Sequence, residues 1–333
     1  MVCVLVMAPL LFLGGPDYYS PRSAALSWQL GHPLLFFMLV TLVLESFAAR
    51  GKRPWLQLLG LALVLTLLLG GAIEWLQQFV GRQSSWGDVR LDLLGAALAV
   101  GWAGLRQAGR GVWMPRAVLA GALLTLVILD LRPLAVALVD EYRMRRSFPV
   151  LADFSAPFEL ERWASAFPLS VVPAPAGGQG HVMKVTLQPA PYAGFSLRYF
   201  EGDWRGFGRL AMRVFNAQPE ALDLTCRIND RQHETDNRFA DRYNGRFVLV
   251  PGWNNLEIPL ATVRAAPAGR EMDMGRITGV GCFVAGLRED AGVWVGGVEL
   301  GGGCRIRGWE LPERAKLCRD FLHLMDVPRA LKN

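Results

Sequence analysis

The sequence predicts an α-helical membrane bundle of about five transmembrane helices, followed by an all-β sandwich of the jelly-roll type. Residues up to about 138 are mostly Leu, Ala, Val and Gly with few charges, whereas charges are frequent from about 150 onward. In that second part, short segments alternate apolar and polar residues, as half-buried strands do. The chain has 333 residues, and 52% of them are hydrophobic. It is therefore long enough for two domains and too apolar for an ordinary soluble protein.

Four segments follow from this change in pattern. They are a transmembrane helical domain at 1–138, a linker at 139–152, a β-sandwich domain at 153–301 and a helical tail at 302–333. The five cysteines show neither a CxxC pair nor the spacing of a zinc site, so we expect no metal and no cofactor. Part of the net charge of +6 lies beside the membrane helices, and no nucleic-acid-binding motif is present. We therefore expect no nucleic-acid partner.

Five apolar segments predict the helices that cross the bilayer. They lie at about 1–13, 33–49, 55–79, 89–105 and 112–138. A helix needs about 20 residues to cross a membrane, and most of these segments are near that length. The residues that follow the second and fourth segments are basic, namely Arg50, Lys52, Arg53, Arg106, Arg110 and Arg116. Because basic loops stay in the cytoplasm, we expect the chain after about 139 to lie outside it.

Polar residues gather where the third apolar segment ends and the fourth begins. Glu74, Gln78 and Arg82 are four residues apart, so a continuous helix would place them on one face. Asp88 and Asp92 have the same spacing at the start of the next segment. Ionisable side chains within membrane segments are costly unless paired, and they commonly mark functional sites.

This stretch resembles the VanZ-like family of small bacterial membrane proteins, with the likeness extending over about 30–110. The family pattern, roughly E-x3-Q, then G-R, then D-x3-N-x2-G, is matched here by Glu74, Gln78, Gly81, Arg82, Asp88 and Gly95. Asp92 stands where the family usually has Asn. The resemblance implies a helical bundle in the bacterial inner membrane, and it says more about architecture than about chemistry.

Three interpretations of this polar cluster remain open. It can be a clasp between two helices in which Arg82 neutralises at least one of the carboxylates, as the cost of an unpaired buried charge favours. It can bind a lipid headgroup or a lipid-linked sugar at the outer leaflet. It can also be a catalytic acid and base made of two carboxylates. His32 is a further candidate member, although a lone histidine at a helix end is more often a cap or an interface residue.

The second part of the chain contains short alternating runs separated by Gly, Pro and Asn. They lie at 181–188, 193–200, 208–215, 222–228, 246–250, 256–260, 276–284 and 292–300. This spacing is typical of an antiparallel sandwich. Over about 180–300 the sequence resembles jelly-roll domains of the galactose-binding-like and carbohydrate-binding-module type, without a strict ligand motif. The resemblance implies a glycan partner.

The polar loop at 229–245 is the candidate ligand site of the sandwich, because such loops often carry function. Its candidate residues are Asp230, His233, Arg238, Asp241, Arg242 and Tyr243, with Trp204 or Trp253 as a stacking platform. The alternative is a solvated loop in which the arginines pair locally. We expect Cys226 and Cys282 to be buried thiols in strands, and Cys304 and Cys318 to form a disulfide that closes the tail. The sequence leaves both assignments open.

Three functions therefore compete on the sequence alone. The first is recognition of an envelope or extracellular glycan by the outer domain, beside a site for a lipid-linked partner in the membrane. The second is a membrane enzyme that uses Glu74, Asp88 and Asp92 on such a substrate. The third is a structural role in which the sandwich binds other proteins.

Overall fold

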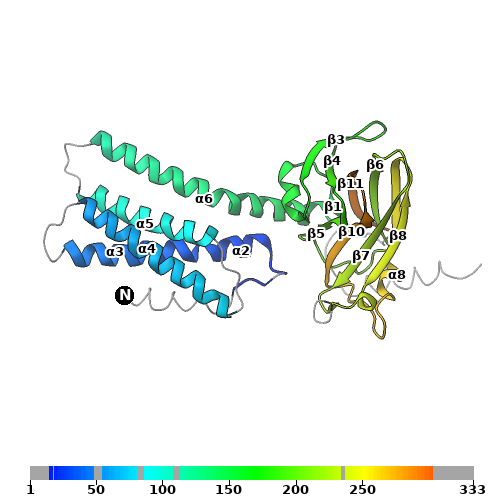
Figure 1. Cartoon of the computed structure of the whole chain (residues 1–333), viewed down its shortest axis with the longest axis horizontal. Coiled ribbons are helices and arrows are strands. Elements are labelled where there is room, and N and C mark those ends of the chain that lie inside the picture. Colours follow the sequence, from blue (N-terminus) through cyan, green and yellow to red (C-terminus); the bar gives the residue numbers. More distant parts are fainter. Residues whose placement is uncertain are drawn as a thin grey trace, which may run out of the picture. The chain divides into compact units, whose positions relative to one another are not determined.

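The structure, a computed structural model, describes residues 15–17, 19–48, 55–80, 86–107, 113–233 and 237–302. The described residues form two compact units, which divide between Glu141 and Tyr142. The first is helical and the second is built of strands, and Figure 1 shows the elements of each. The helical tail expected at 302–333 lies, apart from Gly302, outside the described residues.

The first unit is built of helices, the last of which continues a few residues into the second unit. They are α2 (Arg22–Gln29), α3 (Gly31–Ala48), α4 (Trp55–Gln77) with the short 3-10 helix η1 (Gln78–Val80), α5 (Trp86–Gln107) and α6 (Trp113–Ser147). Three stretches within them are long and apolar enough to cross a membrane, namely Arg22–Phe47, Leu59–Gln77 and Ala117–Ser147. The fourth expected span corresponds to α5, which is not among them and carries several charged residues. The first expected span, 1–13, lies outside the described residues, so the described chain supports three spans where about five were expected.

Helix α5 packs against both α3 and α4, and small side chains make this close approach geometrically feasible. A Cβ atom added to Gly95 would lie only 2.2 Å from the backbone oxygen of Pro33, so α5 and α3 touch through their backbones. A small cluster of buried apolar residues fills the interior between these helices, namely Val40, Leu44, Ala62, Ala96, Ala99 and Val100. Gly95, Ala96 and Ala99 of α5 thus form a packing surface.

The second unit is a sandwich of two antiparallel sheets. Its strands are β1 (Val150–Ala152), β2 (Trp163–Ser165), β3 (Leu169–Pro173), β4 (His181–Leu187), β5 (Ala190–Leu197), β6 (Arg209–Asn216), β7 (Leu222–Asp230), β8 (Tyr243–Leu249), β9 (Gly252–Pro259), β10 (Ile277–Leu287) and β11 (Ala291–Gly301). One sheet has the order β3-β4-β11-β6-β9, with β1 also paired to β11. The other has the order β2-β5-β10-β7-β8. Short helical turns, η2 (Pro157–Arg162), η3 (Phe239–Asp241) and α8 (Leu260–Arg264), complete the unit.

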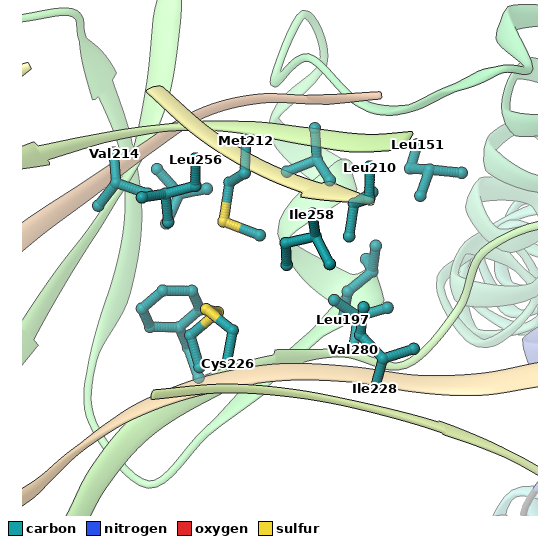
Figure 2. Packing of buried hydrophobic residues seen from close by; sticks show 14 of the residues in the cluster. Leu151, Leu197, Leu210, Met212, Val214, Cys226, Ile228, Leu256, Ile258 and Val280 are labelled. Carbon is teal, nitrogen blue, oxygen red and sulfur yellow. A yellow bond between two sulfur atoms is a disulfide. The ribbon is translucent and has the colours of Figure 1, made fainter. Parts of the chain in front are cut away.

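The core of the sandwich lies between the two sheets. In β6 and β7 every second residue is buried along most of the strand, which is the alternation that the sequence predicts. Figure 2 shows Leu210, Met212 and Val214 of β6 facing Cys226 and Ile228 of β7 across this core. Strands β1, β2 and β3 are short and lie outside the runs that the sequence identifies, so the prediction misses them.

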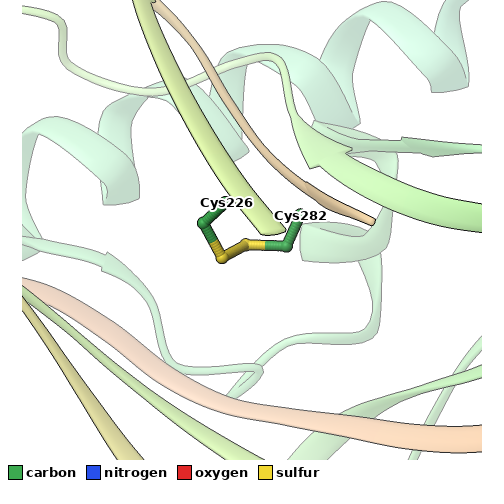
Figure 3. The surroundings of a disulfide bond; sticks show 2 residues. All are labelled: Cys226 and Cys282. Atoms are coloured by element: carbon green, nitrogen blue, oxygen red, sulfur yellow. A yellow bond between two sulfur atoms is a disulfide. The ribbon is translucent and has the colours of Figure 1, made fainter. Parts of the chain in front are cut away.

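Cys226 and Cys282 form a disulfide, shown in Figure 3. They lie directly opposite each other in the register of β7 and β10, and both side chains point into the core. The reading of these two residues as free thiols is therefore wrong, because the pairing of strands 56 residues apart in sequence brings them together. Cys304 and Cys318 lie outside the described residues.

Candidate functional site

The helical unit buries ionisable side chains where α3, α4 and α5 meet. Glu74, Asp88 and Asp92 of the expected cluster are all buried, and Asp92 is fully inaccessible. Gln78 is exposed in η1, whereas its neighbour Gln77 at the end of α4 is buried. The change from an α-helix to a 3-10 turn after Gln77 breaks the four-residue spacing on which the Gln78 prediction depends. Arg82 lies outside the described residues, so its pairing stays a prediction.

His32, from the first turn of α3, joins this cluster. Its Nδ1 atom lies 2.9 Å from Oδ1 of Asp92, and its Nε2 atom lies 3.8 Å from Oδ2 of Asp88. The imidazole is 2% exposed. The sequence names His32 only as a further candidate, because the contact depends on how α3 and α5 pack.

Two glycines allow the three helices to converge on Asp92. Gly95 lies one turn after Asp92 and brings the backbone of α5 against Pro33, the residue that follows His32. A Cβ atom added to Gly70 of α4 would lie 2.6 Å from Oδ2 of Asp92. Small residues on two helices thus hold the imidazole and the carboxylates within a few ångströms of one another.

In the sandwich, two of the candidate loop residues bind a third residue that the sequence analysis does not include. Arg270 donates to both carboxylate oxygens of Asp230, at 2.6 and 2.9 Å. It also donates to both oxygens of Asp241, at 2.6 and 2.7 Å. Arg270 lies 40 residues from Asp230 and 29 from Asp241, so no local pattern identifies it. The loop carboxylates are thus paired, but by an arginine from outside the loop and not by the loop's own arginines.

The pKa values of both carboxyl groups follow from these contacts. Burial raises the pKa of Asp230, but hydrogen bonds from Arg270 and from the backbone N–H groups of Asp273 and His233 outweigh it and hold that pKa below its ordinary value. For Asp241, the hydrogen bonds from Arg270 are the main cause of its lowered pKa. Both groups are therefore firmly ionised partners in a structural ion network.

The other candidates are divided between the core and the surface. Trp204 is 1% exposed, and its indole N–H donates to the carbonyl of Glu201, so it cannot serve as a stacking platform. Trp253 is partly exposed on β9, where it packs against Phe215 and donates to the carbonyl of Ala176. His233 is buried beside Asp241, whereas Arg238 is exposed. These positions do not form one binding surface.

A groove lies on the outer face of the five-stranded sheet. It has a volume of about 620 Å³. Its lining residues are Ala164, Ser165, Ala166, Phe167, Tyr192, Gly194, Phe195, Ser196, Arg227, Phe239, Arg242, Gly281, Cys282 and Phe283. Of the loop candidates, only Arg242 is among them. The groove thus combines exposed rings with a few polar groups, as small-molecule sites do.

The register of the sheet explains how this groove forms. Gly281 of β10 lies between Ser196 of β5 and Arg227 of β7 in one cross-strand row. Because Gly281 has no side chain, the floor of the groove stays open there, and an added Cβ would lie 3.4 Å from Nε of Arg227. Tyr192 and Phe239 are 73% and 66% exposed, so their rings are available for contact.

The groove is positively charged. It contains Arg227 and Arg242, and no carboxylate is among the described residues that line it. Burial and the neighbouring charge of Arg227 lower the pKa of Arg242. The Arg242 guanidinium donates from Nε to Oδ1 of Asn244 and lies 5.4 Å from the centre of the Phe239 ring. Two arginines held together with exposed rings suit an anionic ligand that also has an apolar face.

Comparison with protein-family models found no match, so the resemblance of 30–110 to the VanZ-like family has no support from that source. Comparison with curated proteins also found no match. Among solved structures, the chain is similar to a family 11 carbohydrate-binding module from Clostridium thermocellum in complex with a β-1,3-1,4-mixed-linked tetrasaccharide. The two are 16% identical, with 47% of this chain and 96% of that chain covered and a TM-score of 0.37.

Two further solved structures are also similar to part of this chain. An exo-β-agarase is 9% identical, with 53% of this chain and 30% of that chain covered and a TM-score of 0.37. The module TmCBM61, in complex with β-1,4-galactotriose, is 16% identical, with 45% and 97% covered and a TM-score of 0.30. At such low identities and TM-scores, the ligands of these proteins are properties of those proteins alone.

Proposed function

We propose that this chain is a membrane-anchored glycan-binding protein whose sheet groove holds an acidic glycan outside the cytoplasm. The observation that carries the proposal is the groove itself. Arg227 and Arg242 supply hydrogen-bond donors for a carboxylate or sulfate group. The exposed rings of Tyr192 and Phe239 supply apolar faces against which sugar rings can pack.

The side chains of the helical unit support membrane insertion. Its outward-facing residues are largely apolar, with Leu68 65%, Val118 72% and Leu129 60% exposed, while ionisable residues are buried inside. This arrangement is stable in lipid, where apolar side chains face the hydrocarbon and polar ones face the bundle interior. We propose the bacterial inner membrane as the location and a VanZ-like bundle as the architecture, following the motif at Glu74–Gly95.

Two observations support a position of the sandwich outside the cytoplasm. Glu45 near the end of α3 and Arg106 near the end of α5 lie 3.8 Å apart, so these helix ends share one side of the bundle. The basic sequences that follow both ends would then face the cytoplasm together. The disulfide between Cys226 and Cys282 is also of the kind that persists in oxidising compartments.

The binding test uses an array of acidic and neutral polysaccharides probed with the full-length protein in nanodiscs. We expect binding to uronic acid-containing or sulfated polysaccharides, and at least a tenfold loss in Arg227→Ala and Arg242→Ala. Arg209→Ala is the matched control, because Arg209 is exposed on the other sheet and pairs with Glu257. Equal binding by all three variants, or a preference for neutral glycans, would contradict the proposal.

Membrane orientation has its own test. A reporter fused after Asn333 that is active only in the cytoplasm should be silent, and one that is active only outside should be active. Cytoplasmic activity would place the sandwich on the other side of the membrane.

A second candidate function is an enzyme that acts on a lipid-linked or envelope substrate. The observation that favours it is the burial of Glu74, Asp88 and Asp92 together with His32, which can share protons among themselves. Turnover of a lipid-linked sugar by the full-length protein, and its loss in Glu74→Gln, would establish this activity. Glu45→Gln, at an exposed carboxylate on α3, is the control.

A further inference from the structure

We propose that His32, Glu74 and Asp88 bind one divalent metal ion of the Zn²⁺ class. One donor atom of each residue lies within 4.8 Å of the other two, and all three residues are buried. Donors that share an ion at about 2.1 Å are at most about 4.2 Å apart. Three donors around one tetrahedral ion are about 3.4 Å apart, so side-chain movements of about an ångström would bring all three onto one ion.

The distance between His32 and Asp88 fits a shared ion better than a direct hydrogen bond. Nε2 of His32 lies 3.8 Å from Oδ2 of Asp88, which is beyond hydrogen-bond reach. Two donors bound at about 2.1 Å to a tetrahedral ion are about 3.4 Å apart. The gap between these two atoms is thus close to that between two ligands of the same metal.

Asp92 orients the imidazole for this task. Its Oδ1 atom lies 2.9 Å from Nδ1 of His32, so a proton on Nδ1 is held there and the lone pair of Nε2 is free for a metal. Histidines that bind metals in proteins are commonly held by a carboxylate in this way. Asp92 is therefore a positioning residue.

Asp92 also gives an independent sign that a cation belongs in the cluster. It is fully buried, and its Oδ2 atom has no hydrogen-bond partner among the residues that the structure describes. Such an atom is costly to bury, and a nearby dication would offset that cost. The two arginines of α5 point to other partners, since Arg90 lies 3.0 Å from Asp130 and Arg106 lies 3.8 Å from Glu45.

The donor set indicates the class of ion. One imidazole and two carboxylates suit Zn²⁺ or Mn²⁺, whereas Mg²⁺ and Ca²⁺ prefer oxygen ligands alone. Three protein ligands also leave a coordination position for water or for a substrate oxygen. The cluster would then be a metal centre inside the bundle, which is a property beyond glycan binding by the sandwich.

The experiment measures metal binding by the full-length, tag-free protein in nanodiscs after treatment with a chelator. Zinc content is determined by mass spectrometry after dialysis against Zn²⁺, and affinity is determined by calorimetry. We expect one equivalent of Zn²⁺ per chain. Its affinity should fall at least a hundredfold in His32→Ala, Glu74→Gln and Asp88→Asn, and should be unchanged in the control Glu45→Gln.

The positioning role of Asp92 has a separate readout. Asp92→Asn should keep the single equivalent but bind it about ten- to a hundredfold more weakly. The visible spectrum of the Co²⁺-loaded protein should also shift in this variant, because the imidazole is oriented differently. A spectrum and an affinity identical to those of the unaltered protein would contradict this role.

Several outcomes would overturn the metal site. The site is overturned if the unaltered protein binds no equivalent of Zn²⁺ or Mn²⁺. It is also overturned if His32→Ala retains the ion in full. Glu74→Gln and Asp88→Asn are nearly isosteric, and gel-filtration profiles recorded without metal verify that they fold. Arg82→Ala separates the arginine clasp from the metal site. If the unaltered protein binds no zinc and the Arg82→Ala variant gives less protein in the membrane, the clasp is favoured and the metal site is rejected. None of these measurements depends on the sheet groove, so glycan binding can fail while the metal site holds.

Discussion

The two units of this chain place polar and apolar side chains in opposite ways. In the helical unit, leucines and valines cover much of the outside, while His32, Asp88 and Asp92 are inside. In the sandwich, apolar side chains fill the space between the sheets, and most charges are at the surface. With the helical unit in the membrane, as proposed above, the same physical rule explains both, because each unit presents to its surroundings the side chains that those surroundings solvate best.

The few buried charges of the sandwich are instructive beside those of the bundle. Asp230 is fully buried, but Arg270 and backbone N–H groups satisfy its two oxygens. Asp92 in the bundle is equally buried and has one described partner, His32. A fully paired network such as that of Asp230 stabilises the fold, whereas a buried carboxylate oxygen without a described hydrogen-bond partner, such as Oδ2 of Asp92, leaves room for a ligand.

The largest expected effect tests the completeness of the sandwich network. Arg270→Ala should lower the stability of the sandwich by about 3–5 kcal/mol, because it leaves the buried carboxylate of Asp230 without its cation. Urea unfolding followed by tryptophan fluorescence measures this loss. Arg276→Ala is the control, since Arg276 is exposed and its contact with Asp273 is long, at 4.0 Å. An equal effect of the two substitutions would show that the network adds no stability.

The next effect concerns the disulfide. Replacing Cys226 and Cys282 together by Ala should cost about 2–4 kcal/mol, because the bond closes a long loop between residues 56 apart in sequence. The melting temperature of the sandwich should fall, while the melting of the helical unit should not change. A loss of bundle stability as well would mean that the two units do not unfold independently.

A smaller effect is expected in the bundle. Gly95→Ala should cost about 1–3 kcal/mol, because the added methyl group collides with the backbone oxygen of Pro33. Gly121→Ala on α6 is the matched control, since nothing lies within 4 Å of a Cβ atom there. Thermal unfolding in nanodiscs compares the two. If both variants melt like the original protein, the close contact between α3 and α5 is not needed for stability.

The smallest expected effect is the loss of sandwich stability in acid, which is absent near neutral pH. Asp230 and Asp241 have pKa values below the ordinary 3.8, so their contribution to stability is complete above about pH 4. That contribution is lost as the pH falls through the lowered values, because the folded carboxyl groups then take up protons. Urea unfolding at pH 7, 5 and 3 should show a loss only in the last step. The Arg270→Ala variant should lose less between pH 5 and pH 3.

The sequence predicts most elements of both units and fewer of their contacts. The alternation of apolar residues in β6 and β7 and the long apolar runs of α3 and α4 are local patterns, so they can be read directly. The partners of His32 and Arg270 are 60 and 40 residues away, so the sequence offers His32 only as a candidate and does not identify Arg270.

The groove could not be predicted for a related reason. Its residues come from four strands, from η3 and from the residues next to them, and they come together only through the register of the sheet. The burial of Trp204 could not be predicted from the sequence either. A tryptophan in a turn-rich stretch suggests a surface ring, but this one fills the core.

The disulfide has a consequence for the energetics of any ligand that binds on the opposite face of its strands. Cys226 precedes Arg227 and Cys282 follows Gly281, so a covalent bond behind the sheet holds the two strands that form the floor of the groove. Strands joined in this way have little conformational freedom left to lose when a ligand arrives. Association should therefore carry a small entropic penalty from the protein, and calorimetry should find that most of the ordering on binding occurs in the ligand.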